Sequence, residues 1–176
     1  MKAKFIPFLI IFIFPVAVTA KNLTLTHAPA QVYLSPRGGC TKAIVEAINK
    51  ARTDVLVQAY SFTSREIAKA LVDAHRRGVH VAIILDKSNR SPKYSAADFA
   101  DHMGIPTFID DKHAIAHNKV MIIDKKIVAT GSFNFTKAAE NNNAENLIII
   151  QSKKLAEIYL ANWYQHQRHS TMYKGR

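Results

Sequence analysis

The side chains most able to do chemistry stand in two neighbouring segments, His117-Asn118-Lys119-Val120-Met121-Ile122-Ile123-Asp124 and Gly131-Ser132-Phe133-Asn134. On an extended strand alternate side chains share a face, so we expect His117 and Lys119 to point the same way. Ser132 and Asn134 keep the same spacing, and they offer a hydroxyl and an amide that suit phosphate oxygens. Imidazole, ammonium, hydroxyl and carboxamide together indicate chemistry at a phosphate group without a cluster of metal ligands.

Two further residues of these segments are expected to support the others. Asp124 has the opposite strand parity and stands at a turn, so we expect it to hold backbone or to pair with a neighbouring lysine. Gly131 permits unusual backbone angles or the close approach of a ligand. A lone His-x-Lys pair has no specificity, but the pattern from His117 to Asn134 fixes six residue types over eighteen positions. Such a pattern is rare by chance.

This pattern resembles the H-x-K-x4-D-x6-G-S-x-N signature of the phospholipase D superfamily, and within it the small exported bacterial endonucleases with one motif per chain. The matching residues are His117, Lys119, Asp124, Gly131, Ser132 and Asn134. The resemblance continues through Ala59-Tyr60-Ser61-Phe62-Thr63, the run from Gly131 to Ala139, and Glu145-Asn146. It covers nearly all of the chain after residue 20.

The resemblance implies a role for each matched side chain. His117 would form a covalent phosphohistidine, Lys119 and Asn134 would hold the phosphate, and Ser132 would assist. Glu145 would orient the histidine by accepting a hydrogen bond from its second ring nitrogen, although a surface acid beside an Asn run is the alternative interpretation. The resemblance also implies a 5′-phosphoryl enzyme intermediate, a free 3′-hydroxyl on the leaving strand, and no cofactor.

A second copy of the motif is needed to complete the chemistry. Attack by a histidine requires another group that protonates the leaving alcohol, and the chain contains only one copy of the motif. We therefore expect an isologous homodimer in which His117 of each chain faces one phosphate from opposite sides. One imidazole would be neutral as the nucleophile and the other protonated as the acid. Superfamily members with two motifs in one chain imply the same geometry.

The composition favours a polyanionic partner. The chain has 176 residues, with 24 Lys and Arg against 13 Asp and Glu, and its formal net charge is +11. Basic side chains gain most where phosphates are dense, which favours DNA as the partner, with RNA as a further substrate. The single cysteine excludes a disulfide framework and a multi-cysteine metal site. We expect Cys40 and Trp163 to be buried.

The first twenty residues have the pattern of a secretory signal peptide, because two lysines precede an apolar run that ends at Val18-Thr19-Ala20. A membrane anchor is the alternative, but an apolar run of about 14 residues with two prolines falls short of the ~20 that span a bilayer. We therefore expect cleavage after Ala20, no stable membrane anchor, and a periplasmic or secreted protein. Residues 21–176 are expected to form a single domain.

Strand and helix patterns alternate along this domain. Short apolar runs predict strands at residues 31–34, 55–60, 79–85, 119–123, 127–130 and 146–150. Helical spacing predicts helices at residues 41–51, from the Thr63-Ser64-Arg65-Glu66 capping box to Gly78, at 95–103, and from 153 to about 168. The sequence therefore predicts an α/β fold, a layered sandwich with a mixed β-sheet flanked by helices, as in the superfamily that it resembles.

Residues outside the two segments are weaker candidates. Lys87, Arg90 and Lys93 are expected to contact substrate beyond the scissile phosphate, with a solvated basic face as an equal alternative. His113 and His117 have the i, i+4 spacing that binds zinc on a helix. This stretch has an extended pattern, however, and no third ligand stands nearby in the sequence, so no metal site is expected.

The leading hypothesis is an exported, metal-independent endonuclease that cleaves DNA, and RNA as a further substrate, with little sequence preference. Two alternatives stay open: a phospholipid hydrolase that uses the same chemistry, and a nucleic-acid-binding accessory protein whose catalysis is incidental. The basic charge favours nucleic acid over lipid. The complete set of catalytic residue types argues against an inactive site.

Overall fold

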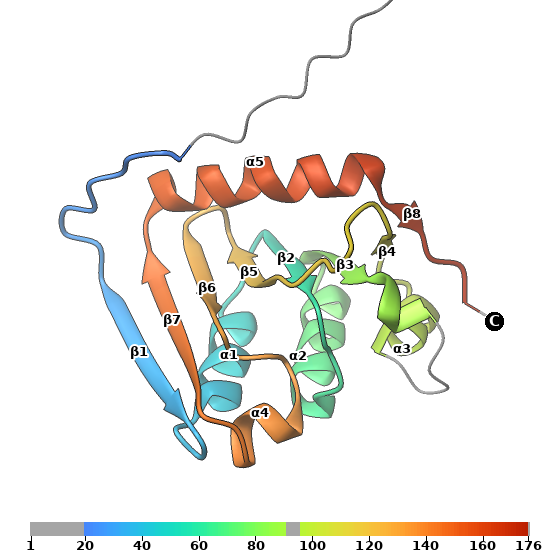
Figure 1. The fold of residues 1–176 in the computed structure, drawn as a ribbon, viewed down its shortest axis with the longest axis horizontal. Coiled ribbons are helices and arrows are strands. Elements are labelled where there is room, and N and C mark those ends of the chain that lie inside the picture. Colours follow the sequence, from blue (N-terminus) through green and yellow to red (C-terminus); the bar gives the residue numbers. More distant parts are fainter. Residues whose placement is uncertain (1–19, 91–95, 176) are drawn as a thin grey trace, which may run out of the picture.

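The central element of the protein is an eight-stranded mixed sheet, seen in a computed structural model that describes residues 20–90 and 96–175 (Figure 1). Its strand order is β1-β7-β6-β5-β2-β3-β4-β8. The strands are β1 (Ala30–Ser35), β2 (Asp54–Ala59), β3 (His80–Asp86), β4 (Thr107–Asp110), β5 (Lys119–Ile123), β6 (Ile127–Gly131), β7 (Glu145–Gln151) and β8 (Thr171–Met172). The β2–β3 and β3–β4 pairs are parallel and the other five pairs are antiparallel. The predicted α/β fold with a mixed sheet is confirmed.

Helices cover both faces of this sheet (Figure 1). They are α1 (Cys40–Asn49), α2 (Arg65–Arg76), α3 (Ala96–His102), α4 (Lys137–Asn141) and α5 (Lys153–His169), with a 3₁₀ helix, η1, at Lys87–Arg90. On one face Val57 and Met121 pack in a core with Ile44 of α1 and Ile67 of α2. Strand residues of the other parity form a second core beneath α5. The layered sandwich thus follows from the two-residue period of each strand.

The second core is centred on Trp163 of α5. This side chain is buried against Leu56, Ile84 and Ile122, and its Nε1 donates a hydrogen bond to the Val57 carbonyl at 2.9 Å. A buried indole needs such a partner for its N–H. The expectation that Trp163 packs in the core is confirmed, and its hydrogen bond fixes the position of α5 on the central strand β2.

Four short elements were not predicted from the sequence: β4, β8, α4 and the 3₁₀ helix η1. The capping prediction for α2 was also displaced by one residue, since Ser64, not Thr63, is the N-cap and its hydroxyl accepts a hydrogen bond from the Ile67 N–H. The cause is the Phe135 carbonyl, which accepts hydrogen bonds from the N–H groups of both Thr63 and Ser64. These bonds keep Thr63 outside the helix.

Residues 1–19 of the expected signal peptide lie outside the described residues. Within the described part of the chain, no helix has the length and apolar character needed to cross a membrane.

Cys40 is fully buried, as expected, and burial together with the nearby Glu140 carboxylate raises the pKa of its thiol to about 11.

Candidate active site

The site begins where β2 ends and β5 starts. Lys119, the first residue of β5, pairs with Ala59, the last residue of β2. The next residue, Tyr60, donates its backbone N–H to the Asn118 carbonyl at 2.7 Å, which extends the pairing beyond the two strands. His117 follows along the same edge, with its ring centroid 4.5 Å from that of Tyr60. The antiparallel register therefore gathers Tyr60, His117 and Lys119 at one end of the sheet.

Lys119 is a buried cation in this group. Its side chain is 6% exposed, its Nζ donates to the His117 carbonyl at 3.2 Å, and it lies 5.0 Å from the centroid of the Tyr60 ring. Burial lowers the pKa of the ammonium, and the negative charge of Glu145 acts in the opposite direction. A partly desolvated ammonium attracts an anion more strongly than a hydrated one does. His117, by contrast, is exposed and accessible to a substrate.

The second segment lies on the neighbouring strand. Thr130 of β6 pairs with Val120 of β5, so Gly131 at the end of β6 lies beside the start of β5. Gly131 has φ of 151°, and a Cβ there would stand 2.2 Å from the Asn146 carbonyl oxygen. The close approach of β7 therefore requires glycine at this position. The unusual backbone angles expected at Gly131 are present as its positive φ.

Ser132 and Asn134 have different surroundings. The Ser132 hydroxyl accepts hydrogen bonds from the Asn146 backbone N–H at 3.0 Å and from its side-chain Nδ2 at 3.3 Å. The Asn134 Oδ1 is buried without a hydrogen-bond partner among the described residues. A buried acceptor without a donor is costly, and only a hydrogen-bond donor could complete this oxygen, so a phosphate would be contacted by the Nδ2 of the same amide.

Glu145 starts β7 and lies near enough to Lys119 to affect its pKa. Its Oε1 accepts a hydrogen bond from the Asn143 Nδ2 at 3.1 Å, and its backbone N–H donates to the Ser35 hydroxyl. The second contact holds the backbone of Glu145, and the first holds its carboxylate beside Asn143. Its orienting of His117 stays a prediction.

Asp124 accepts hydrogen bonds from backbone N–H groups, as expected. Its Oδ1 accepts hydrogen bonds from the N–H groups of Arg52 at 2.9 Å and Thr53 at 2.8 Å, and from the Thr53 hydroxyl at 3.1 Å. The Lys126 ammonium is 3.9 Å from the other oxygen. Burial alone would raise the pKa of Asp124, but these hydrogen bonds lower it below the ordinary 3.8. Asp124 thus joins the end of β5 to the start of β2.

We expect the substitution Asp124→Asn to lower the free energy of unfolding by about 1–3 kcal/mol at pH 7, because an amide loses the charge-assisted bonds. The pKa of Asp124 is lowered on folding, so its charge stabilises the protein above pH 3.8 and this advantage disappears as the pH falls through the lowered value. Urea unfolding at pH 7 and at pH 3 measures both differences. Glu157→Gln, at an exposed position on α5, is the control. An equal loss at both pH values would contradict the assigned role.

Two of the three basic residues expected to extend the site, Lys87 and Arg90, have protein partners. Lys87 Nζ donates to the His113 carbonyl at 3.1 Å, and Arg90 forms a salt bridge of 3.2 Å with Asp111. Both therefore lie along the loop that leads to His117. Lys93 lies outside the described residues. The contact of these side chains with substrate stays a prediction.

Two features of this region were missed in the sequence. Tyr60 was noted only as part of a resembling segment, yet its ring contacts His117 and lies beneath Lys119. The expectation that His113 has no further ligands nearby is wrong, because Asp110, His166 and His169 surround it. Tyr60 had a local signal, since it directly follows a buried strand, and Asp110 is only three positions before His113, whereas His166 and His169 come from a distant helix.

Comparisons with known proteins agree with this arrangement. A family model described as "Cardiolipin synthase, PLD-like domain" matches residues 44–166. A protein of Rickettsia prowazekii named phospholipase D is 43% identical over 160 residues, covering 84% of this chain and 78% of the relative.

Solved structures show the same fold. Nuc of Salmonella typhimurium, a phospholipase D family member, superimposes with a TM-score of 0.81 and 40% identity, over 85% of this chain and all of Nuc. NucT of Helicobacter pylori gives a TM-score of 0.77 and 26% identity, over 84% of this chain and all of NucT. With the family model and the signature residues at one end of the sheet, these matches show that the chain belongs to the phospholipase D family and is a hydrolase of phosphodiester bonds.

Proposed function

We propose that this protein is an exported, metal-independent endonuclease that cleaves DNA, and RNA as a further substrate, with little sequence preference. The observation that carries the proposal is the exposed imidazole of His117 beside the buried ammonium of Lys119, both held against Tyr60. An accessible nucleophile and a fixed cation are the two parts that phosphoryl transfer needs most.

In the first step the neutral imidazole of His117 attacks phosphorus. A nitrogen–phosphorus bond forms, the bond from phosphorus to the 3′-oxygen breaks, and the leaving oxygen takes a proton from an acid. Lys119 and the amide of Asn134 stabilise the negative charge on the other phosphate oxygens. Lys119 supplies the positive charge that a divalent ion supplies in other phosphoryl-transfer enzymes.

In the second step water attacks the phosphohistidine. The group that acted as acid now accepts the proton of the water, the nitrogen–phosphorus bond breaks, and His117 is released with a 5′-phosphate product. We propose that the acid is His117 of a second chain in a homodimer, because each chain has one copy of the motif. The exposure of His117 leaves it accessible to such a partner.

Charge supports nucleic acid as the substrate. A net charge of +11 on 176 residues favours a long polyanion over a single phospholipid headgroup. The sequence also resembles the family's small exported bacterial endonucleases, and the signal-like pattern of residues 1–20 supports a periplasmic or secreted location.

Phospholipid hydrolysis is the second candidate. The observation that favours it is the 43% identity to a protein of Rickettsia prowazekii named phospholipase D. The same two-step chemistry would act on the phosphodiester of a phospholipid, so the site residues do not separate the two substrates. A direct comparison of substrates does.

We expect the purified chain to nick plasmid DNA in excess EDTA, and to leave phosphatidylcholine vesicles intact under the same conditions. The reason is that His117, Lys119 and Asn134 supply the nucleophile and the charge without a divalent ion. Gel analysis of plasmid and release of choline measure the two reactions. Hydrolysis of the lipid with intact DNA would establish the second candidate, and cleavage only after addition of excess Mg²⁺, which prefers oxygen ligands, would refute the mechanism.

Mixed dimers test the shared site. If wild-type and His117→Ala chains are unfolded together and refolded at random, activity should fall as the square of the wild-type fraction, because a mixed dimer lacks either nucleophile or acid. An equal mixture then keeps about one quarter of the activity, against about one half for independent sites. Native mass spectrometry verifies the mixing. A linear decrease would place the acid within the same chain.

A further inference from the structure

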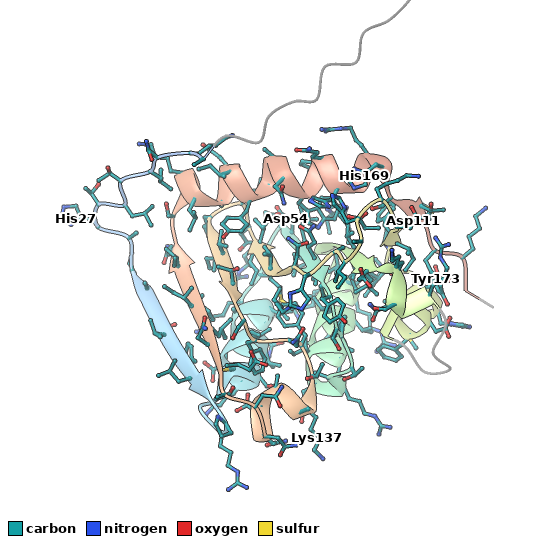
Figure 2. All side chains as sticks on the ribbon, viewed as in Figure 1. His27, Asp54, Asp111, Lys137, His169 and Tyr173 are labelled. Atoms are coloured by element: carbon teal, nitrogen blue, oxygen red, sulfur yellow. The ribbon has the colours of Figure 1, made fainter. Side chains whose placement is uncertain are left out.

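Four potential metal ligands converge beside the C-terminal end of α5. Asp110 ends β4, His113 lies three residues further in the following loop, and His166 and His169 occupy the last turns of α5. Each offers one ligand atom, and these four atoms lie within 4.8 Å of one another. Figure 2 shows His169 at the end of α5, near the loop that carries Asp111. Residues more than fifty positions apart in the sequence thus meet at one point.

The spacing of the ligand atoms suits a small cation. The Asp110 Oδ2 is 2.6 Å from the His166 Nδ1 and 3.3 Å from the His169 Nε2, and the Asp110 Oδ1 is 3.1 Å from the His113 Nδ1. In a tetrahedral zinc site with bonds of about 2.0–2.1 Å, neighbouring ligand atoms are about 3.3 Å apart. The Asp110–His166 pair would have to open from 2.6 Å, and pairs as wide as 4.8 Å would have to close, to reach this spacing, and rotation of the rings can supply both changes.

The cluster is sheltered but open on one side. The Asp110 side chain is fully buried, and those of His166, His169 and His113 are 14%, 29% and 44% exposed. An ion can therefore enter past His113 and reach a buried carboxylate. The three rings also pack on one another, with centroids 4.9–5.3 Å apart.

The two segments that carry the ligands are fastened by backbone contacts. The Lys112 N–H donates to the Asp110 Oδ1 at 3.1 Å, and the Ser170 hydroxyl donates to the His166 carbonyl at 2.7 Å. Ile109, next to Asp110, pairs with Thr171, two residues after His169, in the β4–β8 ladder. A metal site requires ligands held on such rigid elements, because ordering them on binding would cost affinity.

We propose that Asp110, His113, His166 and His169 bind one Zn²⁺ ion per chain. Three imidazoles and a carboxylate are borderline and hard donors that suit zinc, and four protein ligands fill its tetrahedral shell. A filled shell makes the site structural. The ion would fasten α5 to the loop that leads from Asp110 to His117, and it takes no part in the chemistry at phosphorus.

Cobalt binding tests the proposal directly. The chain, purified without an affinity tag and stripped of metal by a chelator, is titrated with Co²⁺. We expect one Co²⁺ per chain, the visible absorption of tetrahedral cobalt, and displacement by one equivalent of Zn²⁺. His166→Ala and His169→Ala should each weaken binding by more than the 10–100-fold typical of a change outside the ligand shell.

Two controls locate the ion. The variant His80→Ala, at an exposed position in β3, should bind Co²⁺ as the wild type does. So should His117→Ala, because the candidate active site is not the proposed metal site. Addition of Zn²⁺ should raise the melting temperature of the wild type and of both controls, and that of His169→Ala far less. His169 is partly exposed, so this variant serves if His166→Ala fails to fold.

Either of two results would overturn the proposal. One is the absence of tetrahedral cobalt absorption and of a zinc-induced shift in melting temperature in the wild type. The other is binding that is unchanged in both His166→Ala and His169→Ala. The cluster would then be a carboxylate that accepts hydrogen bonds from three rings. Neither readout involves phosphodiester hydrolysis, so these results leave the proposed endonuclease activity to its own tests.

Discussion

The variant His117→Ala is expected to lose at least about four orders of magnitude in kcat on plasmid DNA, because it lacks both the nucleophile and, in a symmetric dimer, the acid. The melting temperature should change little, since the side chain is exposed. Strand cleavage under single-turnover conditions measures the loss. The matched control is His80→Ala, which removes another exposed imidazole and should keep full activity.

The same variant should still bind DNA, because its basic groups remain. Its affinity is expected to fall with salt, with a slope of roughly −0.9 in log–log form for each phosphate contacted on duplex. A His117→Ala protein that retains more than a few per cent of wild-type cleavage would contradict the assignment of the nucleophile. Lost binding together with lost cleavage would show that the substitution disturbs the fold.

The variant Lys119→Met should lower kcat/KM by a factor of about 10²–10³, the usual loss when one preorganised group that stabilises transition-state charge is removed. Methionine keeps the length of the buried chain and removes only the ammonium, so the free energy of unfolding should not decrease. The control is Lys126→Met on the same hairpin, where the ammonium is 3.9 Å from Asp124. An equal decrease in both variants would indicate loss of general basic charge and would refute a specific role for Lys119.

The sequence was most informative where the signal is local. The strand at 119–123 was predicted with its observed ends, because an unbroken apolar run from Val120 to Ile123 lies between Lys119 and the Asp124 turn. The same two-residue period placed His117 and Lys119 together. The position of Asp124 at a turn likewise indicated its contact with backbone, although its partners, Arg52 and Thr53, are about seventy positions away.

Features that depend on tertiary pairing could not be predicted. Strand β8 has only two residues and exists because Thr171 and Met172 pair with β4. Helix α4 has five residues, and its Glu140 carboxylate accepts hydrogen bonds from Gly39 and Thr41 at the start of α1. A search by sequence spacing cannot reveal such partners.

The cluster of His113, His166 and His169 around Asp110 also depends on tertiary contacts, so the sequence did not reveal it. His166 and His169 lie three positions apart on a helix, a spacing common on any polar helix surface. They become potential metal ligands only together with Asp110 and His113, which reach them because β4 lies beside the end of α5 (Figure 1). The contact of Tyr60 with His117 and Lys119 likewise depends on the register between β2 and β5.

The central claim, that hydrolysis proceeds through a phosphohistidine at His117, is tested most directly by the stereochemical course at phosphorus. A dinucleotide with one phosphorothioate linkage of known configuration is hydrolysed in isotopically labelled water, and the configuration of the thiophosphate product is determined. Each in-line displacement inverts phosphorus, so attack by His117 followed by attack by water predicts overall retention. Overall inversion would mean that water attacks the phosphodiester directly, and it would contradict the covalent mechanism.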